Sequence, residues 1–416
     1  MTDPSTRTDS PGEADAPDRV TEPPVLLEAP SEGVPHVVET ERELDEAAAA
    51  VAAGEGPIAI DAERASGYRY GQRAYLVQVR REGSGTWLVD PVAVPDLAPL
   101  ADAIGPAEWI LHAATQDLAC LAEVGLRPHQ LFDTELAARI LGLPRVGLAA
   151  VVEHYLGLRL AKEHSAVDWS TRPLPEPWLR YAALDVEVLG ELRNLMGVDL
   201  AAQGKDEWAR QEFASLLSWS PTERVDPWRR TSGINTLRSR RALAVVRELW
   251  YARDDIARER DTSVGRVLPD AALVDIAKAS PRATSDLPRG HRAIARYGRQ
   301  WVEAVARALD LPEDELPPRS LPPDGPPPPR VWADKNPVAA ARLKDTRAAL
   351  TAFAEEHGIP VENVCSPDPL RRVVWTPPAD LDAAAFESAL AGYGVRPWQA
   401  EIVAPMLAAA FAAHGD

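Results

Sequence analysis

A set of acidic side chains beside two apolar segments limits most strongly the folds open to this sequence. Asp61 and Glu63 follow the run Ile58–Ile60, and a strand points residues i and i+2 to the same side. Tyr181 and Asp185 are four residues apart in an apolar-periodic segment that reads as a helix, so they share a face. Clustered carboxylates are costly unless cations neutralise them, and oxygen ligands favour Mg²⁺ or Mn²⁺. The pattern predicts a two-metal nuclease site.

Length and apolar patterning set the broad class. A chain of 416 residues is long enough for two or three separate cores. It has no uninterrupted apolar run of membrane-spanning length and no secretory signal pattern, so we expect a soluble, cytoplasmic protein. Cys120 and Cys365 match no metal-binding spacing and predict neither a disulfide framework nor a zinc site.

The charge is unevenly distributed. The formal net charge is −18, yet residues 224–300 carry +8. An acidic segment followed by an arginine-rich one suits an enzyme in which one domain binds metal ions and its neighbour holds phosphates. The alternative is an ordinary charged surface on helices.

The pattern along the chain predicts five segments. Strands followed by alternating helices indicate an α/β domain with a mixed sheet at 34–223. Residues 1–33 are acidic, proline-rich and expected to be disordered. An all-helical domain is predicted at 224–310, a proline-rich extended linker at 311–330 and a second helical domain at 331–416.

Several elements of the α/β domain can be placed. Thr40 and Glu43 have capping-box spacing and predict a helix that ends near Gly54. Strands are expected at about 36–39, 58–61, 74–80, 86–90 and 109–112. Helices are expected at about 115–124, 134–141, 147–156 and from 176 to beyond 212.

The acidic residues match the requirements of phosphodiester hydrolysis. Two divalent ions about 4 Å apart activate a water and stabilise the leaving oxygen. Asp61, Glu63, Asp117 and Asp185 are the candidate ligands, and Tyr181 can orient the attacking water. An isolated Asp at a strand end is usually a turn former and an isolated Tyr on a helix usually packs in the core, so only the joint pattern carries weight.

Other residues are candidates for contact with nucleic acid, since guanidinium groups bind phosphates in a bidentate manner. A solvated helix face is the alternative for the arginines, and a structural hydrogen bond is the alternative for His112. Lys162, His164 and Arg172 lie in a loop near the expected site, and Trp169 is expected to border it. The nucleic-acid-binding candidates are Gln78, His112, Arg229, Arg230, Arg238, Arg240 and Arg241.

Three ordered motifs resemble the exonuclease motifs of the DEDDy family, and the match is closest to ribonuclease D. The helical segment after Trp228–Arg230 resembles an HRDC domain, and the last domain resembles a second HRDC-like module less distinctly. The resemblance covers roughly residues 35–310. The stretches that carry it are Ile60–Glu63, Leu111–Leu118, Leu131–Thr134, Asp168–Leu174 and Tyr181–Asp185.

The resemblance implies a ribonuclease H-like fold in which Asp61, Glu63, Asp117 and Asp185 bind two Mg²⁺ or Mn²⁺ ions and Tyr181 positions the water. It further implies hydrolysis from the RNA 3′ end to nucleoside 5′-monophosphates, with 3′ extensions of tRNA and other stable RNAs as substrates. Ribonuclease D usually has Thr between the first Asp and Glu and an aromatic residue after them. This chain has Ala62 and Arg64, so contacts to the terminal nucleotide are expected to differ.

Two other functions remain open at this point. A DNA exonuclease of the same fold would use the same carboxylates, and a catalytically silent nucleic-acid-binding adaptor would lack a ligand. All four carboxylates and the tyrosine are present. A monomer is expected, because three domains in a ring or arc could enclose RNA without a second chain.

Overall fold

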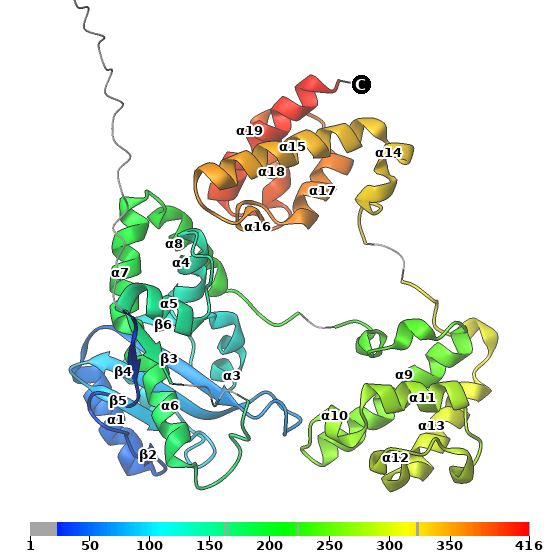
Figure 1. Cartoon of the computed structure of the whole chain (residues 1–416), viewed down its shortest axis with the longest axis horizontal. Coiled ribbons are helices and arrows are strands. Elements are labelled where there is room, and N and C mark those ends of the chain that lie inside the picture. The colour runs from blue at the N-terminus through cyan, green and yellow to red at the C-terminus, as the bar shows by residue number, and fades with distance from the viewer. Residues whose placement is uncertain (1–22, 162–163, 165, 223, 322–323, 416) are drawn as a thin grey trace, which may run out of the picture.

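The protein folds into three domains, seen in a computed structural model that describes residues 23–161, 164, 166–222, 224–321 and 324–415. An α/β domain comes first, an all-helical domain lies beside it, and a second all-helical domain lies above both (Figure 1). The predicted fold class is therefore confirmed. None of the helices in the described ranges combines the length and apolar character needed to cross a membrane.

A six-stranded mixed sheet forms the centre of the first domain, in the order β2-β5-β4-β3-β6-β7. The pairs β3/β4 and β4/β5 are antiparallel, whereas β2/β5, β3/β6 and β6/β7 are parallel. The strands are β2 (Val37–Val38), β3 (Glu55–Arg64), β4 (Ala74–Glu82), β5 (Gly85–Val89), β6 (Glu108–Leu111) and β7 (Gln130–Asp133).

Helices pack around this sheet, and α6 lies across β3, β4 and β5. The predicted capping box at the start of α1 is present, with reciprocal hydrogen bonds between Thr40 and Glu43, and the helix ends at Gly54 as predicted. The helices are α1 (Glu41–Ala53), α2 (Ala98–Ile104), α3 (Leu118–Glu123), α4 (Thr134–Ile140), α5 (Leu148–Leu156), α6 (Glu176–Glu187), α7 (Leu189–Ala202) and α8 (Asp206–Leu216), with a 3₁₀ turn η1 at Ala114–Gln116.

A second, two-stranded sheet was not predicted. Strand β1 (Val25–Leu27) pairs in parallel with β8 (Leu158–Leu160). The expectation that residues 1–33 are disordered is therefore wrong for 25–27, and residues 1–22 lie outside the described part of the chain. The apolar side chains of Val25 and Leu26 remain exposed, so the pairing depends on backbone hydrogen bonds that composition does not reveal.

The second domain is built around its own apolar core, which includes the fully buried Trp228 and Trp301. The long helix α9 is packed by α11 and α13, and the chain continues into this core as far as Leu316, which is only 3% exposed. The elements are η2 (Pro227–Arg230), η3 (Ile234–Thr236), α9 (Arg240–Glu259), α10 (Val264–Val267), α11 (Asp270–Ala279), η4 (Thr284–Asp286), α12 (Arg292–Arg296), α13 (Gly298–Asp310) and η5 (Glu313–Glu315).

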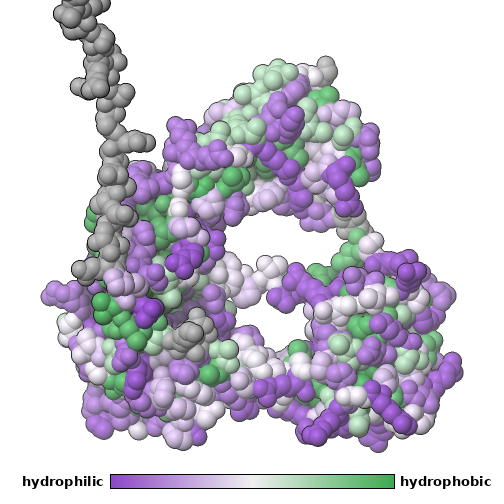
Figure 2. Space-filling model, viewed as in Figure 1, coloured by the Kyte–Doolittle hydropathy of each residue, from purple (hydrophilic) through white to green (hydrophobic). Residues whose placement is uncertain are grey.

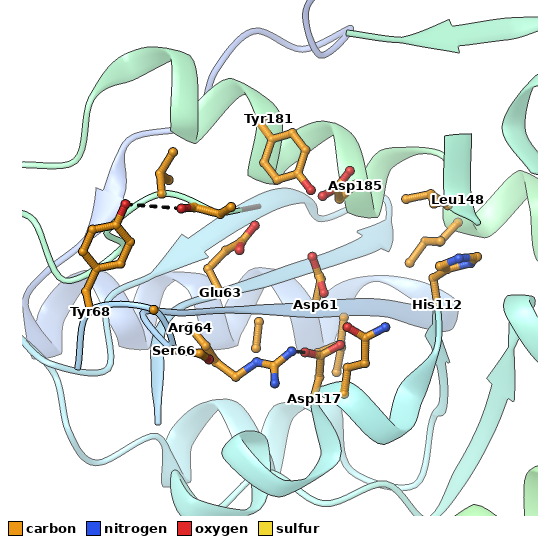
Figure 3. A pocket seen from close by; sticks show the side chains of 17 residues that line it. Asp61, Glu63, Arg64, Ser66, Tyr68, His112, Asp117, Leu148, Tyr181 and Asp185 are labelled. Atoms are coloured by element: carbon orange, nitrogen blue, oxygen red, sulfur yellow. Dashed lines mark hydrogen bonds and ion pairs between the residues drawn. The ribbon is translucent and has the colours of Figure 1, made fainter. Parts of the chain in front are cut away.

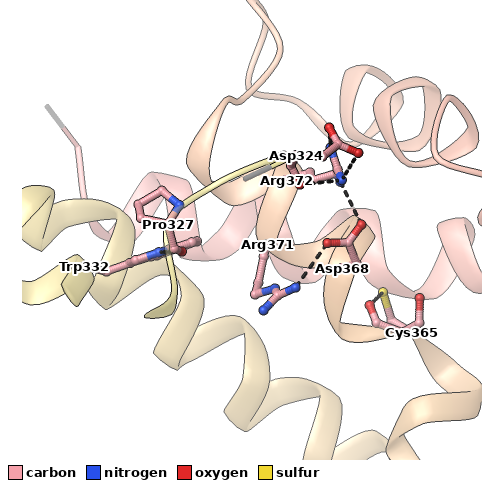
Figure 4. A network of polar contacts seen from close by, with 8 residues as sticks. Asp324, Pro327, Trp332, Cys365, Asp368, Arg371 and Arg372 are labelled. Carbon is pink, nitrogen blue, oxygen red and sulfur yellow. Dashed lines mark hydrogen bonds and ion pairs between the residues drawn. The ribbon is translucent and has the colours of Figure 1, made fainter. Parts of the chain in front are cut away.

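Polar contacts attach the end of the proline-rich segment to the third domain (Figure 4). Arg372 donates to the Asp324 backbone carbonyl at 3.0 Å and pairs with its carboxylate, and Trp332 Nε1 donates to Pro327 O at 2.7 Å. The extended linker is thus shorter than the predicted 311–330. The helices of this domain are η6 (Pro329–Val331), α14 (Trp332–Lys335), α15 (Pro337–Glu356), α16 (Val361–Val364), α17 (Pro367–Trp375), α18 (Ala383–Ala391) and α19 (Pro397–Ala413).

The first domain contacts both helical domains. Trp208 on α8 stacks on Trp398 of α19 with ring centroids 4.8 Å apart, and Lys205 Nζ donates to Ile140 O and His357 O at 2.9 and 2.6 Å. On the other side, the Tyr70 hydroxyl lies 3.0 Å from Asp254 Oδ2. Figure 2 shows open space between the three domains, divided by the chain that connects the first domain to the second.

Candidate active site

The candidate active site lies where α6 crosses β3. Asp61 and Glu63 project from the strand, and Tyr181 and Asp185 project toward them from the helix (Figure 3). One carboxylate oxygen from each of Asp61, Glu63 and Asp185 lies within 4.8 Å of the others. Both periodicities used in the sequence analysis, two for the strand and about four for the helix, therefore direct these side chains to one point.

Asp117 is placed by a tight turn after β6. Ala113 adopts a left-handed conformation with φ of 59°, which is unusual for a residue with a side chain. The Asp133 carboxylate accepts the backbone N–H groups of Ala113 and Ala114 at 3.1 and 2.8 Å, and also those of Glu135 and Leu136. Asp133 thus fixes the turn and caps α4. From the sequence, Asp133 was recognised only as part of the resemblance, and this role was not predicted.

Burial and mutual repulsion shape the electrostatics of the cluster. Removal from water raises the pKa of Glu63 well above its ordinary value, and the charges of Asp61, Asp185 and Asp117 raise it further. The pKa values of Asp61 and Asp117 are also raised, chiefly by burial. Such a set of buried oxygen donors fits a hard divalent cation, because the ion would supply the positive charge that the carboxylates lack.

Arg64 supplies part of that charge from the protein itself. Its Nη2 is 3.4 Å from Oδ1 of Asp117, and the Asp117 side chain is 6% exposed. A register shift in the β3/β4 pairing lies between Glu63 and Arg64, so the regular strand pattern is interrupted at this residue. The structure thus shows Arg64 paired with Asp117.

Tyr181 is a neutral hydrogen-bond donor in this setting. Its hydroxyl bonds to Asp185, and burial together with that carboxylate raises its pKa. The ring lies over the fully buried Trp169, with centroids 6.5 Å apart, and His164 meets it edge-on at 6.1 Å. Trp169 therefore packs against the Tyr181 ring and helps to fix its position.

A cavity of about 470 Å³ opens over the carboxylates, a volume within the range of small-molecule sites. Ser66, Gly67 and Tyr68 form one wall, and Leu148 lies near His112 on the opposite side. The sequence analysis named none of these residues except His112. Ser66, Gly67 and Tyr68 lie in a loop and Leu148 begins α5, and no local pattern marks them as part of a site.

Gln78 and His112 were both predicted to contact nucleic acid, and the structure shows where each side chain lies. Gln78 is fully buried beside Asp61 in the β3/β4 pairing, which leaves it no surface for a ligand. His112 does line the cavity, but its Nδ1 lies 2.8 Å from the Thr134 hydroxyl, and burial lowers its pKa to about 4, so the ring is neutral.

The structure also places Arg172, one of the three loop residues expected near the site. Arg172 does not face the cavity but grips Asp90 with Nε and Nη2 at 2.6 and 2.9 Å, and it donates to the Tyr75 carbonyl at 2.7 Å. Arg172 was expected near the site, but these contacts hold its side chain outside the cavity lining. Lys162 lies outside the described residues.

Three of the five arginines expected to bind phosphate instead form hydrogen bonds and ion pairs within the second domain. Arg229 pairs with Asp226 at 2.8 Å and donates to Pro318 O. Arg240 donates to Leu316 O, and Arg241 donates to Leu311 O and pairs with Glu313 at 2.8 Å. Arg230 and Arg238 are both exposed. The first three arginines hold the chain that leaves α13, so their predicted role in binding RNA has little structural support.

Comparison with known proteins agrees with this geometry. The 3′-5′ exonuclease family model matches residues 35–201, the HRDC domain model matches 242–305, and the model for the 3′ to 5′ exonuclease C-terminal domain matches 325–411. A ribonuclease D from Jannaschia sp. is 32% identical over 352 residues, which is 80% of this chain and 87% of the relative. The chain belongs to the ribonuclease D family.

Solved structures support the same assignment. A protein from Bifidobacterium adolescentis is 40% identical with a TM-score of 0.84, and the match covers 94% of this chain and all of that one. RNase D from Escherichia coli, an exoribonuclease involved in structured RNA processing, is 28% identical with a TM-score of 0.64, over 92% and 99% of the two chains. This ribonuclease D family member is thus a 3′-5′ exonuclease with an acidic site that could bind metal.

Proposed function

We propose that the enzyme hydrolyses RNA from the 3′ end and releases nucleoside 5′-monophosphates. The observation that carries the proposal is the meeting of Asp61, Glu63 and Asp185 within 4.8 Å, with Tyr181 hydrogen-bonded to Asp185 at their edge. Family membership supports RNA as the substrate.

We further propose that the site takes two divalent ions, Mg²⁺ or Mn²⁺. Asp61, Glu63 and Asp185 would hold one ion, and Asp117 with Asp61 would complete the position of the other. When bound, these ions lower the pKa of a water and stabilise the charge on the leaving oxygen. The donors fit this role because all are carboxylates and they repel one another.

The protein's own groups orient the reactants. The Tyr181 phenol stays protonated at neutral pH because its pKa is raised, so it donates a hydrogen bond and does not act as a base. Its position one helical turn from Asp185 places the donor at the edge of the carboxylate cluster. The neutral His112 ring adds a polar edge to the same cavity without adding charge.

The physiological substrates in this proposal are 3′ extensions of tRNA and other stable RNAs, bound by a monomer. The test compares a tRNA carrying a short 3′ extension, the mature tRNA and a DNA strand of the extension sequence. The account expects rapid removal of the extension, nucleoside 5′-monophosphates as the only products and slow attack on DNA. Preferential digestion of DNA would favour a DNA exonuclease, and release of oligonucleotides would contradict exonucleolytic cleavage.

A further inference from the structure

Four arginines surround a cavity on the second domain. Arg260 follows α9, Arg266 lies on α10, and Arg292 and Arg296 lie on α12. All four are exposed, and they share the cavity, of about 410 Å³, with the buried Tyr297. We call this group of five residues the arginine cradle. None of the arginines predicted from the sequence to bind nucleic acid belongs to it.

Three of the four cradle arginines have no ion-pair partner among the described residues. Within the described ranges, no carboxylate oxygen lies within 4.0 Å of Arg260, Arg292 or Arg296. Other arginines of the same domain do form ion pairs, such as Arg253 with Asp270 at 2.6 Å and Arg258 with Asp254 at 2.6 Å. Exposed like charges that converge on one cavity attract an anion, which would relieve their mutual repulsion.

Tyr297 supports the guanidinium groups from below. The Arg260 and Arg296 guanidinium carbons lie 5.3 and 5.4 Å from its ring centroid. Because the tyrosine is only 7% exposed, it has little surface on which a base could stack. The cradle therefore presents charge and hydrogen-bond donors, which suits a phosphate backbone and not the recognition of bases.

The cradle also adjoins the wall of the active-site cavity. Gly67 and Tyr68 line that cavity, and Arg266 Nε donates to Gly67 O at 2.9 Å with its guanidinium 4.2 Å from the Tyr68 ring centroid. Ser263 adds hydrogen bonds to both, at 3.0 Å from Oγ to Gly67 O and 3.1 Å from its N–H to Tyr68 O. An RNA strand that left the active site past Tyr68 would therefore reach Arg266 next.

We propose that the arginine cradle binds the phosphodiester backbone of the RNA strand on the 5′ side of the nucleotides held in the active site. The proposal rests on the proposed exoribonuclease function. The cradle acts as a sequence-independent holding site at a fixed position beside the catalytic cavity, so that long single strands bind more tightly than short ones.

The test uses the full-length chain with Asp185→Asn, which prevents cleavage during binding. Affinity for a dinucleotide and for a 16-nucleotide single-stranded RNA is measured by fluorescence anisotropy across a range of salt concentrations with Mg²⁺. The test variant adds R292Q and R296Q. The matched control adds R307Q and R347Q, which make the same charge change on exposed helix surfaces outside the cradle.

The cradle variant is expected to bind the 16-mer about tenfold more weakly, and its plot of log affinity against log salt should be shallower by about 1.4, since each phosphate contact to a single strand contributes about 0.7. Dinucleotide affinity and the control variant should be unchanged. Arg292→Lys with Arg296→Lys should restore most of the slope, because it keeps the charge.

An unchanged 16-mer affinity and slope, or an equal loss for the dinucleotide, would overturn the proposal. Circular dichroism of each variant excludes loss of folding as the cause. Failure of the proposed function is seen separately, as absence of RNA hydrolysis by the wild-type enzyme.

Discussion

Arg64 reaches toward the carboxylate cluster and ends 3.4 Å from Asp117, between its Nη2 and the aspartate Oδ1. The two residues come from different elements, one at the end of β3 and the other at the turn after β6. The guanidinium therefore offsets part of the cluster's negative charge and competes with a cation for Asp117.

Replacing Arg64 with alanine should tighten Mg²⁺ binding, because it removes a positive charge close to the ion. The Mg²⁺ concentration at half-maximal activity is expected to fall about threefold, a modest effect for charges in a partly hydrated site. Titration of activity with Mg²⁺ measures it. Arg69→Ala is the control, because Arg69 pairs with Asp261 and does not line the cavity. Weaker Mg²⁺ binding by R64A would show that Arg64 supports the metal site.

Glu63→Gln should stabilise the metal-free protein by about 1 kcal/mol at pH 8, in line with the usual conflict between stability and active-site function. The folded-state pKa of Glu63 is raised, so the native state binds the proton more tightly than the unfolded state. Stability of the wild type in chelator should consequently fall as pH rises from the ordinary glutamate pKa through the raised one.

Urea unfolding in chelator at several pH values measures this effect, and the variant should show a flatter pH dependence. Mg²⁺ should stabilise the wild type more than the variant, because binding to the native state alone raises the free energy of unfolding. A variant less stable than the wild type in chelator would contradict the view that burying the charged Glu63 carboxylate among like charges costs stability.

Tyr181→Phe should lower kcat by about 100-fold while leaving RNA affinity nearly unchanged, since positioning the attacking water affects the reaction and not binding. The apolar contacts with Trp169 survive the change, so folding should be intact. Steady-state kinetics on a short RNA separate kcat from KM. A rise in KM with unchanged kcat would assign the hydroxyl to substrate binding.

Trp208→Ala should loosen the third domain from the first. Trp208 stacks on Trp398 at 4.8 Å and also meets Phe353 and His357, at 6.1 and 5.9 Å between ring centroids. Faster proteolytic cleavage between the second and third domains and a larger radius of gyration by X-ray scattering are expected. The control is Trp219→Ala, because Trp219 is 36% exposed. Equal behaviour of the two variants would show that other contacts fix the domain.

The sequence predicted what depends on local periodicity. The capping box at Thr40 and the alternation of Asp61 and Glu63 were read correctly, as was the four-residue spacing of Tyr181 and Asp185, because each depends on neighbours in one element.

What it missed depends on contacts between distant residues. Arg172 grips Asp90, 82 residues away, and Asp133 holds a turn 20 residues before it. Strand β1 pairs with β8 far along the chain. The arginines of the second domain look alike in sequence, and only the fold separates Arg241, which donates to the end of α13, from Arg292, which faces a cavity.

The central claim is that the carboxylate cluster performs metal-dependent hydrolysis of RNA from its 3′ end. The most direct test is time-resolved digestion of a 5′-labelled single-stranded RNA by the wild type and Asp185→Asn, with Mg²⁺, Mn²⁺ or chelator. The account predicts a ladder that shortens from the 3′ end only for the wild type with metal, while the variant still binds the RNA. Digestion in chelator, or an active Asp185→Asn variant, would contradict it.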